Sequence, residues 1–248
     1  MSGHSKWATI KRAKGKTDAA RSKVFTKIGR ELAVAVKLGG ADPNSNASLR
    51  GVIAKAKAAN MPNDNIQRSI KKASGELGSI NYESIVYEGY GANGVAVIVE
   101  TLTDNKNRTG GDVRHIFDRS GGALGTNGCV SYMFESKGVI DIEKTDKMDD
   151  DEMMMTALDA GADDFSVDGN VYEILTSPEN FNAVRDTLEA KGYSFIRSEI
   201  DRIPNMTVDL DDEAAEKIVR MLDLFEDNDD VQNVYHNANL PESEEDDE

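Results

Sequence analysis

The amino-acid sequence predicts a multidomain α + α/β protein, in which an N-terminal three-helix domain precedes two ferredoxin-like α+β domains, one inserted in the other. Apolar residues recur at helical spacing up to about residue 75, whereas short strand-like runs alternate with helical segments beyond residue 80. The charge changes at the same place. Residues 1–80 carry 16 Lys and Arg against 5 Asp and Glu, a formal charge of +11, whereas residues 81–248 carry 13 against 40, a formal charge of −27.

Three helices are expected in the basic domain, separated by residues that cap, start or stop helices. These residues are Thr17 or Asp18 and Gly39-Gly40 for the first helix, Asp42 and Pro43 for the start of the second, and Pro62 and Gly75 for the third. The apolar positions that give the first helix its buried face are Val24, Phe25, Ile28, Leu32, Ala35 and Val36. Three short helices of this kind predict a small bundle.

The middle of the chain is typical of one complete ferredoxin-like domain. Its elements follow the order β-α-β-β-α-β, and the dipeptide Asp168-Gly169 marks the hairpin between the two central strands. The expected elements are strand 138–143, helix 149–160, strands 164–167 and 171–176, helix 178–191 and strand 193–202.

Half of a similar arrangement stands on each side of this domain. The expected elements before it are strand 95–99, helix 109–120 and strand 130–134, and those after it are strand 206–210, helix 212–225 and strand 231–235. Either half alone would leave a bare sheet edge or face. We therefore expect the two halves to pair into one domain, with the middle domain inserted.

These inferences set the domain boundaries. The predicted domains are a basic helical nucleic-acid-binding domain at 1–80, a discontinuous α/β domain at 81–135 and 204–240, and an inserted ferredoxin-like domain at 136–203. Residues 241–248 consist mostly of acids, and we expect them to be a disordered tail.

The composition excludes several classes of protein. No run reaches the ~20 apolar residues that span a bilayer, and the first residues lack the apolar core of a signal peptide, so we expect a cytoplasmic protein with no membrane partner. The single Cys129 cannot form an intramolecular disulfide, and with three histidines it makes no plausible zinc site. We expect no metal, no cofactor, no small-molecule substrate and no catalytic residue, since no Ser or Cys has a recognisable nucleophile setting.

The positive charge of the first domain indicates binding to nucleic acid. Few acids neutralise it, and phosphate contacts would account for the excess. Such contacts carry no sequence information, so they do not distinguish DNA from RNA, and a solvated helix face is the alternative. The candidate residues are Lys6, Lys11, Arg12, Lys14 and Lys16 in the lead, and Arg21, Lys23, Lys27 and Arg30 on the first helix.

A second basic spot is expected inside the acidic part, where a strand is followed by a helix near residues 104–109. Free backbone N–H groups at such a junction attract anions, and Arg108 and Arg114 belong to this region. The alternative is a capping loop, in which Asp104 or Asn105 closes its own turn.

Two glycine-rich segments fail the requirements of nucleotide-binding loops. Residues 89–94 match G-x-G-x-x-G, but a strand rather than a helix follows, so we predict a tight turn between strands. Residues 121–128 lack the Lys-Ser/Thr ending of a phosphate loop and predict a flexible loop.

Eight groups of residues, in order from residue 2 to residue 237, follow a pattern found in one known family. They are Ser2–Trp7, Phe25–Leu32, Asn60–Pro62, Tyr87–Gly91, Asp104–Thr109, Val113–His115, Gly121–Thr126 and Asp229–Asn237. Together they make the chain similar to the YebC family of probable transcriptional regulators, which includes a mitochondrial translational activator. The chain departs from the usual family pattern at Gly110-Gly111, which weakens the first turn of that helix by up to roughly 1 kcal/mol per glycine.

The resemblance implies a helical first domain and two α/β domains, the third inserted in the second. It also implies non-enzymatic regulation of gene expression through nucleic acid, and first of all a DNA-binding transcriptional regulator. The alternative is a translation factor associated with the ribosome, which binds ribosomal or transfer RNA and aids the synthesis of difficult nascent sequences. A protein-interaction adaptor that acts through its acidic surface is a third interpretation.

Overall fold

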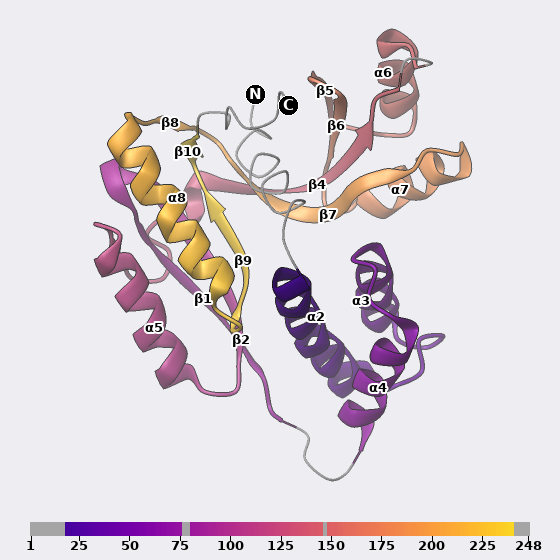
Figure 1. Ribbon diagram of the computed structural model, residues 1–248. Helices are drawn as coiled ribbons and strands as arrows, with labels where there is room; N and C mark the ends of the chain where they lie inside the picture. The colour runs from indigo at the N-terminus through magenta and orange to yellow at the C-terminus, as the bar shows by residue number, and fades with distance from the viewer. Residues whose placement is uncertain (1–17, 76–79, 146–147, 241–248) are drawn as a thin grey trace. The chain divides into compact units, whose positions relative to one another are not determined.

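The computed structural model describes residues 18–75, 80–145 and 148–240 (Figure 1). The described residues form two compact units: residues 132–207 make one, and residues 18–131 and 208–240 make the other. The first unit is thus inserted in the second. This arrangement confirms the predicted fold class, in which a helical domain and two α/β domains are combined by insertion. Within the described ranges, no helix is both long enough and apolar enough to cross a bilayer.

The helical domain contains the three predicted helices. They are α2 (Asp18–Gly39), α3 (Ala47–Ala58) and α4 (Asn63–Ser74). One apolar cluster joins them, and it includes the fully buried Leu32 of α2, Leu49 of α3 and Ile66 of α4. The predicted apolar face of the first helix is confirmed except at Val24, which is 43% exposed.

The second helix starts later than the expected Pro43, because Asn46 caps it. The Asn46 side-chain oxygen accepts a hydrogen bond from the backbone N–H of Leu49 at 3.0 Å, and its Nδ2 donates to the carbonyl oxygen of Ala35 at 2.8 Å. Pro43 lies in the turn before the cap. A single buried amide therefore fixes both the start of α3 and its attachment to α2.

The inserted domain has the predicted β-α-β-β-α-β order. Its elements are β4 (Phe134–Glu143), α6 (Asp150–Asp159), β5 (Asp164–Asp168), β6 (Val171–Thr176), α7 (Phe181–Ala190) and β7 (Phe195–Pro204). The strands form one antiparallel sheet in the order β5-β6-β4-β7. Helices α6 and α7 pack on the same face of this sheet, around Ile140, Tyr172 and Val184.

The split domain is built from both sides of the insertion. Its elements are β1 (Glu83–Tyr90), β2 (Ala96–Thr103), α5 (Lys106–Arg119), β3 (Ala123–Leu124), β8 (Val208–Asp209), α8 (Asp212–Asp227), β9 (Val231–His236) and β10 (Ala238–Asn239). The main sheet has the order β3-β1-β2-β9, so a strand after the insertion pairs with one before it. Helices α5 and α8 cover one face of this sheet (Figure 1), where the rings of Phe117 and Phe225 lie 5.4 Å apart.

Two predicted strands of this domain are wrong. Ser131–Met133 form a 3₁₀ turn, because the carboxylate of Glu88 accepts hydrogen bonds from the backbone N–H groups of Val130 and Ser131, both at 2.9 Å. Those N–H groups are then not available for a strand ladder. The strand expected at 206–210 is reduced to β8, which pairs with β10 and not with the main sheet. Strand β1 occupies the position between β2 and β3 instead.

The glycine-rich segment 121–128 is mostly exposed, but it contains the short strand β3 and is held at some of its glycines. The Glu88 carboxylate also accepts from the backbone N–H of Gly128 at 2.8 Å. Burial alone would raise the pKa of Glu88, but these backbone hydrogen bonds lower it. A Cβ atom at Gly122 would lie only 2.4 Å from the carbonyl oxygen of Tyr90, so the close approach requires glycine. The segment at 89–94 is a tight turn between strands, as predicted.

The two glycines of α5 give a first testable prediction. The helix continues through both of them, and a Cβ at Gly111 would meet no atom within 4 Å. We expect Gly111→Ala to raise the free energy of unfolding by about 1 kcal/mol, measured by urea denaturation, because alanine loses less backbone entropy in a helix. Gly89→Ala is the contrasting variant and should lower stability, since its Cβ would lie 2.5 Å from the carbonyl oxygen of Ala123. A less stable Gly111→Ala protein would contradict this account.

Candidate nucleic-acid interface

The predicted cationic face of α2 lies against acidic and carbonyl groups of the split domain. The ammonium group of Lys23 lies 2.6 Å from a carboxylate oxygen of Asp227, and Lys27 Nζ donates to the carbonyl oxygen of Glu226 at 3.0 Å. The Arg30 side chain is mostly covered, with 15% of its surface accessible. The three residues therefore link the helical domain to the end of α8 and the turn after it.

Asp230 is the centre of this contact. Its carboxylate accepts hydrogen bonds from the guanidinium groups of both Arg30 and Arg108, the latter at 2.8 Å. The hydroxyl oxygens of Thr103 and Thr109 lie 3.2 and 2.7 Å from the same carboxylate. The side chain of Asp230 is only 5% exposed. One buried acid thus brings together two arginines that the sequence placed in separate basic spots.

The charge of Asp230 is strongly stabilised. Burial alone would raise its pKa, but hydrogen bonds from Arg108, Arg30 and Thr109 lower the pKa to about 2. The same hydrogen bond raises the pKa of Arg108, with a further contribution from Asp104. At neutral pH the Asp230 carboxylate is therefore charged, and it holds the two guanidinium groups in place.

The alternative interpretation of the strand-to-helix junction also has structural support. Asn105 caps α5, and its side-chain oxygen accepts from the backbone N–H of Arg108 at 3.1 Å. Arg108 also lies 2.8 Å from Asp104, one turn away. The junction is thus a capping turn whose arginine is held by two acids, Asp104 and Asp230. Contact between Arg108 and nucleic acid stays a prediction.

The other predicted residues are distributed as follows. Arg21 and Arg114 are exposed, on α2 and α5 respectively. Lys6, Lys11, Arg12, Lys14 and Lys16 lie outside the described residues, as does the acidic tail 241–248. None of these positions is tested as a nucleic-acid contact, so each stays a prediction.

Three cations on α4 are better placed for an external polyanion. Arg68, Lys71 and Lys72 are all exposed, and no acid of the described ranges lies within ion-pair distance of them. Ile66 and Ile70 are buried on the opposite side of the helix. The sequence prediction did not include these residues, although a signal was present, because α4 carries three basic residues against one acid.

A smaller cationic surface lies on α5. Lys106, Arg114 and Arg119 are exposed there, and the described part of the chain offers them no ion pair. This surface includes one predicted residue, Arg114, and adds two that the prediction did not name. The split domain is otherwise strongly acidic, so a phosphate group would be attracted to these three cations rather than to the rest of its surface.

No arrangement typical of catalysis is visible in the described ranges. They contain no group of three or more His, Cys, Asp or Glu side chains suited to hold a metal ion. Burial, and then the nearby charge of Glu88, raise the pKa of the Cys129 thiol, which keeps it protonated and weakly nucleophilic at neutral pH. His115 is exposed on α5.

Known proteins resemble this chain over nearly its whole length. Residues 5–76 match the N-terminal domain model of the TACO1/YebC protein, and residues 82–238 match the model of its second and third domains. A probable transcriptional regulatory protein of Clostridium botulinum (strain Eklund 17B / Type B) is 62% identical over 243 residues, which cover 98% of each chain. One of Acetivibrio thermocellus is 60% identical, over 96% of this chain and 98% of its own.

A solved structure has the same fold. The crystal structure of a conserved hypothetical protein from Aquifex aeolicus superimposes with a TM-score of 0.82 at 44% sequence identity, and the match covers 92% of this chain and 94% of that one. The matched family models together cover most of the sequence, including the helical domain and both α/β domains. The chain therefore belongs to the TACO1/YebC family.

Proposed function

We propose that this chain is a non-enzymatic regulator of gene expression that binds nucleic acid through its helical domain. The observation that carries the proposal is the cationic surface of α4, formed by Arg68, Lys71 and Lys72. It is an exposed patch of like charge in a chain whose formal net charge is −16. The acidic body repels a polyanion, so binding would be directed to the helical domain.

The first candidate target is DNA, in the regulation of transcription. The relatives from Clostridium botulinum and Acetivibrio thermocellus are both called probable transcriptional regulatory proteins, which supports this choice. The basic residues of α4 would lie along the phosphates of a DNA duplex, and Arg114 on α5 would make a second contact. A cytoplasmic location agrees with such a role.

The second candidate target is ribosomal or transfer RNA, in the regulation of translation. One observation favours it: the exposed cations lie on two helices of two domains, α4 and α5, and not along a single recognition helix. Folded RNA presents phosphates in several directions and is recognised largely by shape. In this version the ribosome is the cellular partner.

Crosslinking in cells distinguishes these targets. The full chain would be crosslinked with ultraviolet light and with formaldehyde, and the attached RNA and DNA would be sequenced. Enrichment of promoter DNA supports the transcriptional role, and enrichment of ribosomal or transfer RNA supports the translational one. A variant with Arg68, Lys71 and Lys72 changed to Glu should lose either signal. If neither nucleic acid is enriched above an untagged control, the proposal is wrong and an adaptor role gains support.

A further inference from the structure

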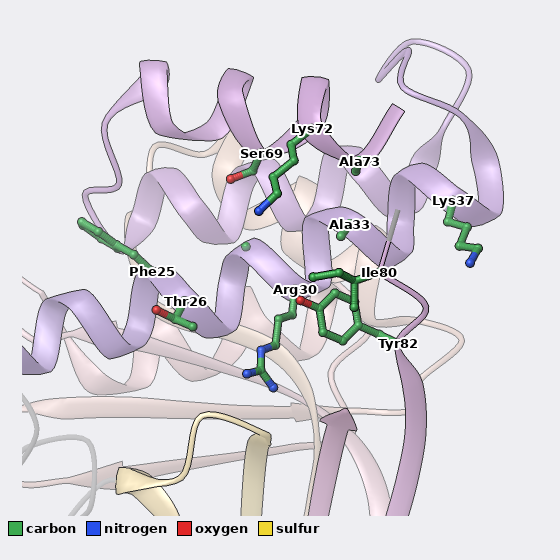
Figure 2. A pocket seen from close by; sticks show the side chains of 11 residues that line it. Phe25, Thr26, Arg30, Ala33, Lys37, Ser69, Lys72, Ala73, Ile80 and Tyr82 are labelled. Carbon is green, nitrogen blue, oxygen red and sulfur yellow. The ribbon is translucent and has the colours of Figure 1, made fainter. Parts of the chain in front are cut away.

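A pocket opens on the helical domain, between α2, α4 and the segment that leads into β1 (Figure 2). Its volume is about 320 Å³. The hollow exists because small residues face one another where α2 passes α4, namely Gly29 and Ala33 on α2 and Ala73 on α4. A pocket of this size lies at the lower end of the range for small-molecule sites and has room for one nucleotide.

The lining of the pocket combines positive charge with aromatic and apolar surface. Arg30, Lys37 and Lys72 contribute charge from two helices, and Figure 2 shows the Lys72 side chain extending from α4 toward α2. No acidic residue lines the pocket, although the chain has 45 of them. Tyr82 and Ile80 form one wall, and Ile80 is 44% exposed, so part of its apolar side chain is accessible to a ligand.

The three cations differ in what they can offer a ligand. Lys37 already donates a hydrogen bond from its Nζ to the side-chain oxygen of Asn81 at 2.6 Å. The Arg30 guanidinium is already bound to Asp230 and lies over the Tyr82 ring, 5.5 Å from its centre. It therefore lies beside the Tyr82 ring, and its charge is already paired with that of Asp230. Lys72 has no ion pair in the described ranges and can turn its ammonium group onto a phosphate. Ser69, beside it on α4, adds a hydroxyl group.

We infer that this pocket binds one nucleotide of a single-stranded nucleic acid, with its phosphate at Lys72 and Ser69 and its base against Tyr82 and Ile80. The inference rests on the proposed function and specifies the form of the target. A nucleotide inside a duplex cannot enter the pocket without leaving its stack, which costs a few kcal/mol. Stacking on an aromatic ring together with a phosphate contact accepts any base, so the pocket favours single strands with little sequence preference.

The test compares a single-stranded 10-nucleotide oligouridine with a 10-base-pair RNA duplex, each fluorescently labelled, by anisotropy at ~0.15 M salt. We expect the full chain to bind the single strand about tenfold more tightly than the duplex. Ser69→Leu fills the pocket without changing the charge, and should weaken single-strand binding about tenfold while duplex binding changes by less than about twofold. Gln67→Leu is the matched control, an exposed polar residue of the same helix outside the pocket, and should leave both affinities unchanged.

Lys72→Ala serves as a second variant if Ser69→Leu does not fold, with Lys71→Ala as its neighbour outside the pocket. Single-strand binding that responds equally to Lys72→Ala and Lys71→Ala, or that Ser69→Leu leaves unchanged, overturns the pocket but leaves nucleic-acid binding intact. Binding of free uridine monophosphate as tight as that of the oligonucleotide overturns the single-strand assignment and indicates a free-nucleotide site. A wild-type chain that binds neither oligonucleotide overturns this inference, whereas the proposed function, which includes DNA as a target, is decided by the crosslinking experiment.

Discussion

Asp230→Asn should lower the free energy of unfolding by about 3 kcal/mol, because it removes the shared acceptor of two arginines in a largely buried contact. Asparagine has nearly the same shape, but its amide group presents a donor and no charge to the guanidinium groups. The loss should be measured by urea denaturation. It should also appear as faster hydrogen exchange of the backbone amides of α2, since Arg30 fastens that helix to the split domain.

The control for this variant is the neighbouring acid. Asp229 is exposed, and Asp229→Asn removes the same charge one residue earlier. We expect its stability to stay within about 0.5 kcal/mol of the wild type, as for other surface substitutions. If Asp230→Asn were equally neutral, the contact centred on Asp230 would not hold the two domains together.

The lowered pKa of Asp230 gives the same contact a dependence on pH. Its folded pKa is about 2, below the ordinary aspartate value of 3.8, so the carboxylate stabilises the folded chain at pH values above about 4. That contribution is lost as the pH falls from about 4 through about 2. A plot of unfolding free energy against pH for Asp230→Asn should therefore be flatter than that of the wild type in this range.

The triple variant Arg68→Glu, Lys71→Glu, Lys72→Glu should raise the dissociation constant for duplex nucleic acid at least about 100-fold at ~0.15 M salt. Each phosphate contact on a duplex contributes about −0.9 to the slope of log K against log salt concentration, so losing three should reduce the slope by about 2.7. Anisotropy titrations at several salt concentrations give both quantities. Circular dichroism confirms that the fold is kept, since all three side chains are exposed.

The matched control replaces three cations by Glu at positions outside α4 and α5. Lys191, Lys217 and Arg220 are exposed cations of the inserted and split domains, and their replacement by Glu gives the same net charge. We expect this control to change the affinity by less than about threefold, because contacts and not net charge govern the salt slope. Equal losses in the two triple variants would show that general repulsion, and not a binding surface on α4, explains the effect.

Most helices and strands could be predicted from the sequence, because the local spacing of apolar residues indicates them. The failures have long-range causes. The strand expected at 130–134 is absent because Glu88, some forty residues earlier, occupies the N–H groups of Val130 and Ser131. The start of α3 was placed too early because Asn46 bonds back to α2. No local periodicity reports where a distant side chain will form a hydrogen bond.

The candidate site was harder to predict for a related reason. Amphipathic spacing on α2 showed which residues avoid the core of the helical domain, and Lys23, Lys27 and Arg30 met that condition. It did not show that a second domain would cover the same face, because the acids that do so follow nearly 200 residues later in the chain. The basic residues of α4 are the ones that stay exposed, and the excess of basic over acidic residues in that helix was the signal for them in the sequence.

The distance along the chain between Arg30 and Asp230 also sets an order of events during synthesis. The two partners are 200 residues apart, and the whole inserted domain is made between them. At 5–20 residues per second, Arg30 is added to the chain about 10–40 s before Asp230. For that interval the basic first domain emerges with its α2 face uncovered, next to the most concentrated RNA in the cell. The chain thus completes the contact between its helical and split domains only when its last strands have been made.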